Sequence, residues 1–129
     1  MTSPQRFSHV EGTWAVARLG PGDAIPPWAL GVTGFVSITR THDELSIVCP
    51  AASVPPDVRA ETGWALLELH GPFPFSQVGV LASFASPLAA SDISLFAVST
   101  FDTDYILVKS AQVEAACIAL VAAGHTLVA

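Results

Sequence analysis

Positive charge is scarce in this sequence. Its 129 residues include five lysines and arginines against eleven aspartates and glutamates, which gives a net charge of −6. The basic residues are spread along the chain: Arg6, Arg18, Arg40, Arg59 and Lys109. Because binding to nucleic-acid phosphates depends on clustered positive charge, we expect no nucleic-acid partner.

Long apolar runs are absent as well. Hydrophobic residues make up 51% of the chain and charged residues only 12%, yet no run approaches the roughly 18 apolar residues of a membrane-spanning helix. Residues 1–8 lack the apolar centre of a secretory signal, and we expect a short frayed terminus there. The sequence therefore predicts a cytoplasmic protein without a membrane partner, with some of its apolar surface buried at a subunit interface.

Cysteine and histidine are too few and too scattered to indicate a metal site. Cys49 and Cys117 each lie in an apolar segment, which favours buried thiols over the alternative of a disulfide. The histidines form no close pair with one another, with a cysteine or with an acid at metal-ligand spacing; they are His9, His42, His70 and His125. We therefore expect no metal and no cofactor.

Signatures of catalysis are missing too. The chain has no G-x-S-x-G elbow, no cysteine with a histidine nearby in sequence, and no glycine loop that could hold a phosphate. The sequence favours a protein that is not an enzyme. A catalytic site assembled from distant residues is the less favoured alternative.

What the chain does contain is an internal repeat. TWAVARLG at residues 13–20 matches GWALLELH at residues 63–70, with an offset of 50. SITRTHDELSIV at residues 37–48 matches AVSTFDTDYILV at residues 97–108, with an offset of 60. The ten residues gained between the two matches are the difference between a short connection and a helix, so we expect two related units, the first abbreviated.

The second copy of the repeat predicts the element order βαββαβ. Residues 77–90 place apolar side chains at helical spacing after Ser76, a candidate N-cap, and Pro87 should kink or end the last turn. A second helix is predicted over residues 110–123, with Gly124 at its end. Strands are expected at residues 35–39, 45–49, 93–99, 105–109 and 125–129.

These elements predict the fold class α+β, with ferredoxin-like (βαββαβ) units in tandem. Right-handed crossovers would put both helices on one face of a four-stranded antiparallel sheet, and the sheets of the two units would pair side by side. In the first unit, GPGDAIPPWALG permits at most one helical turn around Trp28. The expected divisions are an N-terminal tail at 1–12, the abbreviated unit at 13–49, a linker at 50–62 and the second unit at 63–129.

One stretch carries a resemblance to a known family. GPFPFSQVGVLASFASPLAASDISLFAVSTFDTDYILVKS, residues 71–110, resembles the ACT domains of the tandem-ACT family, which includes small bacterial two-ACT proteins and the cytosolic arginine sensors of the CASTOR type. STFDTDYILV is its most specific part. The resemblance implies ACT units in tandem and a regulatory ligand sensor that binds an amino acid, or a similar small polar molecule, at an ACT–ACT interface.

The resemblance also implies which residues form the ligand site. The implied ligand-binding residues are Gln77, Val78, Gly79 and Val80 in the loop before the helix and Ser99, Thr100, Phe101, Asp102 and Asp104 around the following turn. Backbone amides at a helix N-terminus suit the carboxylate of an amino acid. The two carboxylates suit its ammonium group or a cationic side chain.

Two departures from the sensor pattern keep alternatives open. Where the arginine sensors carry an acid before the helix, this chain has Gln77, which weakens the case for arginine as the ligand. The chain also has two units instead of four, which predicts a homodimer and leaves room for an unidentified protein partner. The main alternative is a structural or dimerising module without a ligand, in which Asp102 and Asp104 only stabilise a hairpin turn.

The large aromatic residues have structural interpretations. Tryptophans lie more often in cores than in pockets, so we expect Trp14, Trp28 and Trp64 to pack. We expect Phe73 and Phe75 to cover the end of the sheet.

Overall fold

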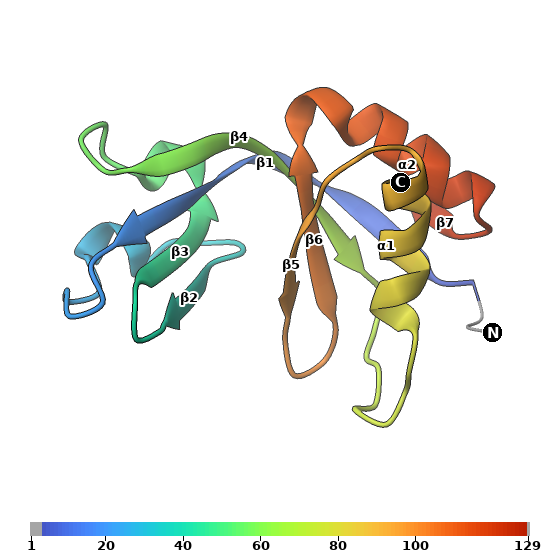
Figure 1. Cartoon of the computed structure of the whole chain (residues 1–129), viewed down its shortest axis with the longest axis horizontal. Helices are drawn as coiled ribbons and strands as arrows, with labels where there is room; N and C mark the ends of the chain where they lie inside the picture. The colour runs from blue at the N-terminus through green and yellow to red at the C-terminus, as the bar shows by residue number, and fades with distance from the viewer. Residues whose placement is uncertain (1–3, 129) are drawn as a thin grey trace. The chain divides into compact units, whose positions relative to one another are not determined.

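The computed structural model describes residues 4–128. Within that range the chain forms seven strands, two α-helices and three short 3-10 turns (Figure 1). In chain order these are β1 (Arg6–Leu19), η1 (Pro27–Ala29), β2 (Ser37–Arg40), β3 (Leu45–Pro50), η2 (Ala51–Ser53), β4 (Ala60–Leu69), α1 (Val80–Ala90), β5 (Phe96–Ser99), β6 (Asp104–Lys109), η3 (Ser110–Gln112), α2 (Val113–Ala122) and β7 (Thr126–Val128). The α+β class and the ferredoxin-like order β4-α1-β5-β6-α2-β7 confirm the prediction.

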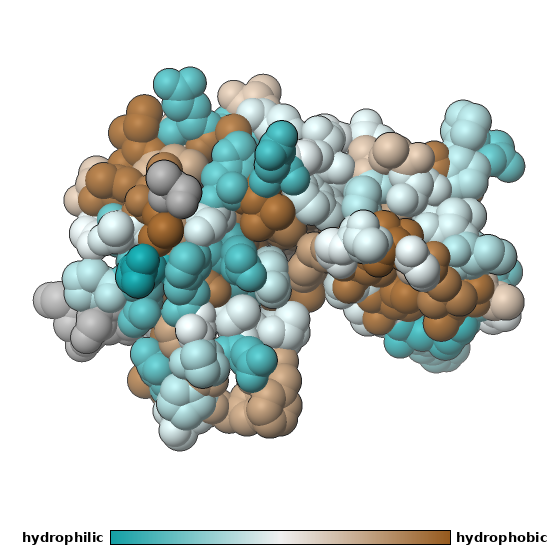
Figure 2. Space-filling view, turned by 180° about the vertical axis from the view of Figure 1, so that it is seen from behind, coloured by the Kyte–Doolittle hydropathy of each residue, from teal (hydrophilic) through white to brown (hydrophobic). Residues whose placement is uncertain are grey.

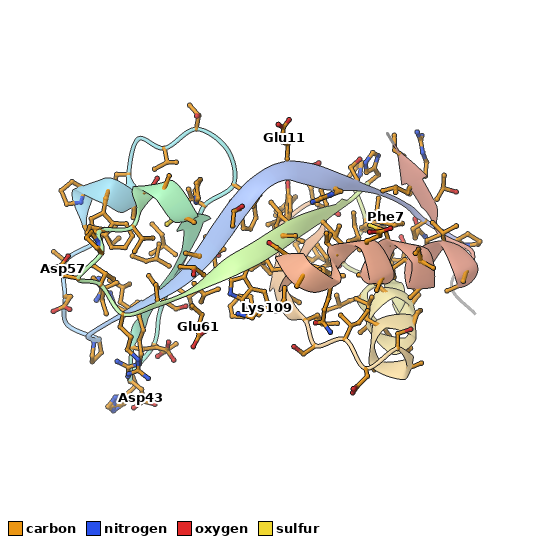
Figure 3. The ribbon with its side chains drawn as sticks, turned by 90° about the horizontal axis from the view of Figure 1, so that it is seen from above. Phe7, Glu11, Asp43, Asp57, Glu61 and Lys109 are labelled. Atoms are coloured by element: carbon orange, nitrogen blue, oxygen red, sulfur yellow. The ribbon has the colours of Figure 1, made fainter. Side chains whose placement is uncertain are left out.

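The chain divides into two units, each with its own core. The helix-bearing unit combines residues up to Glu11 with Ala65 onward, and the small unit is Gly12–Trp64. Strands β1 and β4 pass from one unit to the other, and they run side by side in Figure 3. None of the helices in the described part has the length and apolar character needed to span a bilayer.

The N-terminal segment is a correction to the sequence prediction. Residues 6–8 were predicted to lie in a frayed terminus and residues up to 12 in an N-terminal tail, but residues 6–12 form the first half of β1. Phe7 there is fully buried and packs edge-to-face on Phe84 of α1, with ring centroids 5.8 Å apart. Burial of that ring stabilises the segment by about 1.5–3 kcal/mol, enough to hold it in the sheet.

The same segment changes the predicted four-stranded sheet. In the helix-bearing unit, β7 pairs in parallel with β1 through Arg6↔Thr126 to Ser8↔Val128. The amide of His70, just after β4, donates to the carbonyl of Arg6. The start of β1 therefore lies between β4 and β7, where the prediction had no strand.

Both helices cover one face of this sheet, as expected. Figure 1 shows α1 and α2 on the same side of the strands. The core beneath them is formed by alternate residues of the strands and by one stripe of each helix: Phe7, Ala65, Leu67, Leu69, Val80, Phe84, Leu88, Ile93, Ile106, Val108, Ala116 and Leu120. In Figure 3, Phe7 lies beside α2.

Helix α1 begins three residues later than its sequence suggested and ends at the predicted residue, Ala90. Its N-cap is Gly79, whose φ of 83° favours a residue without Cβ, and not Ser76. The helix then runs through Pro87 to Ala90. Proline has no amide hydrogen for the carbonyl four residues earlier, which belongs to Ser83.

His125 supplies the missing donor. Its Nδ1 accepts a hydrogen bond from the Gln5 amide at 3.0 Å, so the neutral ring carries its proton on Nε2, which donates to the Ser83 carbonyl at 2.9 Å. The ring is only 5% exposed and stacks on Phe84 at 4.0 Å. A buried histidine from the end of the chain thus stabilises a helix that contains a proline.

The small unit repeats part of this plan with shorter connections. Its order β1-η1-β2-β3 parallels β4-α1-β5-β6, and η1 is the single turn around Trp28 that the proline-rich segment predicted. The core of the unit consists of Ala17, Ala29, Leu45, Ile47 and Cys49, with Trp28 packed against it. Apolar residues gather on the face of this unit that Figure 2 shows.

The two hairpins correspond with an offset of 59 residues, one less than the sequence match indicated. Strands β2 and β3 pair through Ser37↔Val48, and β5 and β6 through Phe96↔Leu107. Thr41 and Thr100 then hold the same place, each donating its amide at 2.8 Å to the carbonyl three residues on. These turn bonds fix the register of each hairpin. A slip of one residue would turn every side chain of the strand to the other face of the sheet.

Cys49 and Cys117 are free thiols, the first buried and the second partly buried. Burial raises the pKa of both thiols, which keeps them in the neutral form. Trp14 is buried, and its indole N–H donates to the Phe35 carbonyl at 3.2 Å. Trp14 and Trp28 are thus packing residues, as predicted.

Candidate functional site

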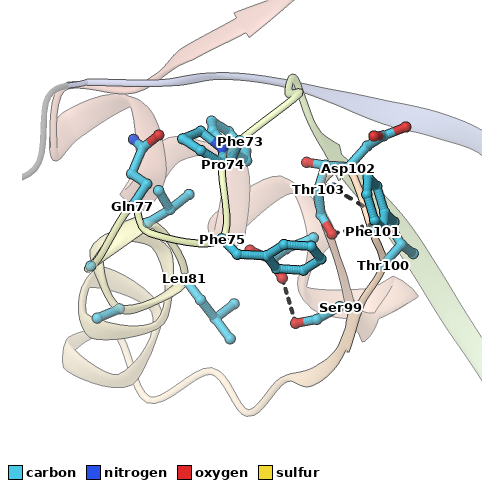
Figure 4. Close-up of a pocket in the computed structure, with 14 residues that line it drawn as sticks. Phe73, Pro74, Phe75, Gln77, Leu81, Ser99, Thr100, Phe101, Asp102 and Thr103 are labelled. Carbon is cyan, nitrogen blue, oxygen red and sulfur yellow. Dashed lines mark hydrogen bonds between the residues drawn. The ribbon is translucent and has the colours of Figure 1, made fainter.

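A hollow of about 320 Å³ lies in the helix-bearing unit, between the pre-helix loop (residues 71–79) and the β5–β6 turn (residues 99–104). Figure 4 shows the two segments as opposite walls, with the first turn of α1 on the side of the loop. Two segments about twenty residues apart in sequence thus share one pocket.

The turn wall is ordered by its own hydrogen bonds. The Thr100 hydroxyl accepts from the Thr103 amide at 3.2 Å, and the Ser99 hydroxyl donates to the Asp104 carboxylate. The Asp104 side chain is therefore held by β5 while it lines the hollow. These bonds serve the hairpin whether or not a ligand is present.

Two hydrogen bonds and one close approach bring the end of β4 and the base of the pre-helix loop against this turn. The Thr103 hydroxyl donates to the Leu69 carbonyl at 2.8 Å, and the Phe73 amide donates to the Asp102 carbonyl at 2.7 Å. At Gly71 an added Cβ would lie 2.7 Å from the Asp102 carbonyl oxygen, closer than atoms tolerate. The base of the pocket accordingly needs glycine at this position.

At the mouth of the pocket two phenylalanine rings meet. Phe75 from the loop and Phe101 from the turn lie edge-to-face with centroids 5.0 Å apart. Both rings are largely exposed, at 77% and 78%. This corrects the prediction for Phe75, which does not cover the sheet; Phe73 alone packs against the core.

The pocket offers acceptors and apolar surface but no positive side chain. Asp102 and Asp104 line it, and none of the lining residues is Lys, Arg or His. Positive electrostatic potential comes from the N-terminus of α1, where the first amides have no intrahelical partner. Such a site can hold a carboxylate at the helix and a cation at the turn.

Most of the predicted site residues lie together in this pocket. The lining includes Gln77, Gly79, Val80, Ser99, Thr100, Phe101, Asp102 and Asp104. Val78 is the exception, since it is 82% exposed and does not line the hollow. The left-handed Gly79 redirects the chain between Val78 and the helix, so neighbouring side chains diverge.

Sequence reasoning missed several lining residues: Phe73, Pro74, Phe75, Leu81, Ala82 and Thr103. Ala82 follows Gly79 by three residues on the helix, a spacing that could have been used. The rings of Phe73 and Phe75 gave no such signal, because only the fold decides which of them turns inward.

A second hollow lies on the other side of the same turn, lined by Glu68, His70, Asp102 and Tyr105 among others. The Tyr105 hydroxyl donates to Glu68 at 3.0 Å. Desolvation, followed by this hydrogen bond and the nearby negative charge, raises the pKa of Tyr105. Among residues 4–128 no three His, Cys, Asp or Glu side chains lie close enough together to hold a metal ion.

Comparison with known proteins matches this geometry to a family. An ACT-domain family model matches residues 59–122, and a second model, described as an N-terminal domain, matches residues 12–57. A crystal structure of a protein from Agobacterium tumefaciens is 45% identical, with a TM-score of 0.92 over 98% of this chain and 94% of that one. Residues 59–122 therefore belong to the ACT-domain family, and part of the chain is similar to the cytosolic arginine sensors.

Two further relatives mark the range of the similarity. The human cytosolic arginine sensor for mTORC1 subunit 1 is 44% identical over 46 residues, which are 35% of this chain but only 14% of the sensor. The regulatory subunit of aspartate kinase from Thermus flavus superposes with a TM-score of 0.66, covering 95% of this chain and 99% of that one, at 11% identity. The second comparison shows the fold alone.

Proposed function

We propose that this protein is a regulatory, non-catalytic sensor that binds an amino acid, or a similar small polar molecule, in the pocket between the pre-helix loop and the β5–β6 turn. The observation that carries the proposal is the convergence of these two segments on one hollow with acids on one wall and a helix N-terminus on the other. The similarity to a cytosolic arginine sensor supports both the role and a cytoplasmic location.

The roles of the residues follow from charge. The amides at the start of α1, beside Gly79 and Val80, bind the carboxylate of the ligand. Asp104 and Asp102 bind its ammonium group or a cationic side chain. Gln77, Ser99, Thr100 and Phe101 provide neutral contacts around them.

The proposal includes a homodimer, in which an ACT unit of a second chain completes the open side of the pocket. A sedimentation experiment should therefore give the mass of two chains, and the amino acid that binds should strengthen the association. The same proposal includes a partner protein that recognises the ligand-bound state. It includes no nucleic-acid partner and no membrane partner.

A structural module without a ligand is the second candidate. The specific observation in its favour is that Ser99 and Thr100 satisfy the turn internally, including the Asp104 carboxylate. In that case Asp104 would act only on the stability of the free protein.

Thermal unfolding in the presence of each of the twenty amino acids separates the two candidates. An amino acid at a hundred times its dissociation constant should stabilise the protein by about 2.7 kcal/mol. Asp104→Asn keeps an acceptor for Ser99 but removes the charge, so it should abolish the ligand shift with little change in the free protein. Asp43→Asn, which removes a carboxylate from the turn of the small unit at the place equivalent to Asp102, is the control and should leave the shift intact.

The sensor proposal fails if no amino acid raises the unfolding temperature of the wild-type protein. It also fails if Asp104→Asn and Asp43→Asn lower the ligand shift equally. Either result would leave the structural module as the better account.

A further inference from the structure

The first turn of α1 lies at one wall of the pocket and has no side-chain cap. Its N-cap residue, Gly79, has no side chain, and the first turn contains no acid. A capping side chain would accept hydrogen bonds from the first amides of the helix, which are the amides that the carboxylate of a ligand needs. Without a cap these amides stay open, and their orientation has to be fixed from another side.

Ser83 fixes two of these peptide groups. Its amide donates to the Gly79 carbonyl at 2.9 Å, and its hydroxyl donates to the Val80 carbonyl at 2.6 Å. Because a peptide unit is planar, each of these carbonyls shares a rigid plane with the amide of the next residue. The bonds of Ser83 therefore orient the amides of Val80 and Leu81, two residues that line the pocket.

Ser83 is itself held by His125. The Ser83 carbonyl cannot receive the usual helical bond, because Pro87 has no amide hydrogen. The Nε2 of His125 donates to this carbonyl at 2.9 Å, and the ring is buried against Phe84. Neither Ser83 nor His125 lines the pocket. A series of hydrogen bonds thus leads from the last strand region to the first turn of α1 without passing through the pocket.

We propose that His125 is a positioning residue for the ligand pocket, which acts through Ser83 to orient the first amides of α1. The inference rests on the proposed function and deepens it, because it assigns part of the ligand affinity to a residue outside the pocket. Amides that are already fixed bind a carboxylate without a further loss of conformational freedom. Releasing the Ser83 carbonyl should therefore weaken ligand binding.

Two substitutions separate the two hydrogen bonds of the ring. His125→Gln places an amide nitrogen near the position of Nε2 and keeps a donor for the Ser83 carbonyl, whereas His125→Asn keeps an acceptor near Nδ1 for the Gln5 amide. Both variants lose the stacked ring, so both should unfold at a similarly lowered temperature.

Ligand affinity should distinguish these variants. Titration calorimetry with each of the twenty free amino acids identifies the tightest binder of the wild-type protein, which then serves as the probe. His125→Asn should weaken binding of the probe by roughly three- to tenfold, and His125→Gln by less than about twofold.

Amide hydrogen exchange gives a readout that needs no ligand. The Ser83 amide, which is bonded to Gly79, should lose more protection relative to the amides of β6 in His125→Asn than in His125→Gln. A merely structural role of the ring would lower protection uniformly in α1 and β6, and to the same extent in both variants.

A second substitution tests the route through Ser83. Pro87→Ala restores a helical donor for the Ser83 carbonyl, so His125→Asn in that background should regain affinity for the probe. His9→Asn replaces an exposed histidine on β1 and is the control, which should change neither affinity nor exchange.

The results that overturn the inference are distinguishable from failure of the proposed function. If His125→Asn and His125→Gln weaken the probe equally, if exchange rises uniformly, or if Pro87→Ala restores no affinity, the positioning role is refuted while the sensor function stands. If none of the twenty amino acids binds the wild-type protein, the sensor function fails and the positioning role fails with it.

Discussion

The hairpins β2–β3 and β5–β6 share a turn and differ in what lies opposite to it. In both, a threonine hydroxyl accepts amide hydrogens of the turn, and the same backbone bond closes it. Opposite Thr100 stands a full helix and a loop that together complete a pocket, whereas the corresponding connection of the small unit has only the single turn η1. The turn is thus a scaffold element, and its functional potential comes from the segment that packs beside it.

The two units differ first in length: the helix-bearing unit has about ten more residues between β4 and β5 than the small unit has between β1 and β2. These residues allow α1 to exist in the helix-bearing unit, and α1 in turn requires contacts that the small unit never needed. Pro87 leaves the Ser83 carbonyl without its helical partner, and His125 from the far end of the chain supplies a donor. The added helix therefore ties the N-terminal and C-terminal segments of the chain to one wall of the pocket.

The largest expected effect on stability comes from replacing His125, which links these segments. His125→Ala leaves the Gln5 amide and the Ser83 carbonyl without their histidine partner and removes the ring stacked on Phe84, which should cost about 2–4 kcal/mol in the free energy of unfolding. Urea unfolding followed by circular dichroism measures this loss.

A second substitution sharpens the same test. Pro87→Ala restores an amide hydrogen that can reach Ser83, so His125→Ala should cost about 1 kcal/mol less in that background. Additive effects of the two substitutions would contradict the proposed replacement of the helical bond by histidine.

A smaller effect should follow from closing the gap at the base of the pocket. Gly71→Ala places a methyl group against the Asp102 carbonyl and should cost roughly 1–3 kcal/mol, because the loop or the turn must shift. Gly22→Ala, in the connection of the small unit where a Cβ would have nothing within 4 Å, is the control and should be nearly neutral. Equal effects in thermal unfolding would show that the close approach at Gly71 is not limiting.

The turn that the two hairpins share allows a matched pair of substitutions. Thr100→Val and Thr41→Val each remove a hydroxyl that accepts turn amides, and each should cost about 0.5–1.5 kcal/mol. In the sensor proposal only Thr100→Val should also lower ligand affinity. A ligand effect from Thr41→Val of the same size would remove the functional distinction between the hairpins.

The smallest effect concerns a position where the two units differ in charge. Glu68 accepts from Tyr105, whereas in the small unit Arg18 lies opposite Ser46. Tyr105 is the only tyrosine, so the absorbance of tyrosinate reports it alone. Its titration midpoint in the folded protein should lie above the ordinary value of about 10, and Glu68→Gln should lower the midpoint partway, since desolvation remains.

The raised pKa of Tyr105 also determines whether the stability of the protein rises or falls with pH. Above pH of about 10 the unfolded chain releases the Tyr105 proton before the folded chain does, so the free energy of unfolding should fall as pH rises through that window. Tyr105→Phe should remove this part of the alkaline loss. An unchanged alkaline profile would contradict the assignment.

Much of the architecture could be predicted because it is encoded locally. Apolar spacing predicted α1 and α2, the proline-rich segment predicted a single turn at Trp28, and Gly124 was expected where the chain leaves α2 with a φ of 105°. The resemblance implied the two walls of the candidate site. Local patterns failed at Val78, where one left-handed glycine turns the neighbouring side chain away, and in the hairpin match, which was off by one residue.

The sequence by itself determined the repeat, the element order of the second unit and the shortage of positive charge, because periodicity and composition are properties of neighbouring residues. Only the tertiary structure decided that β1 enters between β4 and β7, that Phe75 meets Phe101, and that His125 reaches Ser83. Those contacts join residues between 26 and 120 positions apart. Such pairs depend on strand register and on the packing of the whole core, which no short pattern specifies.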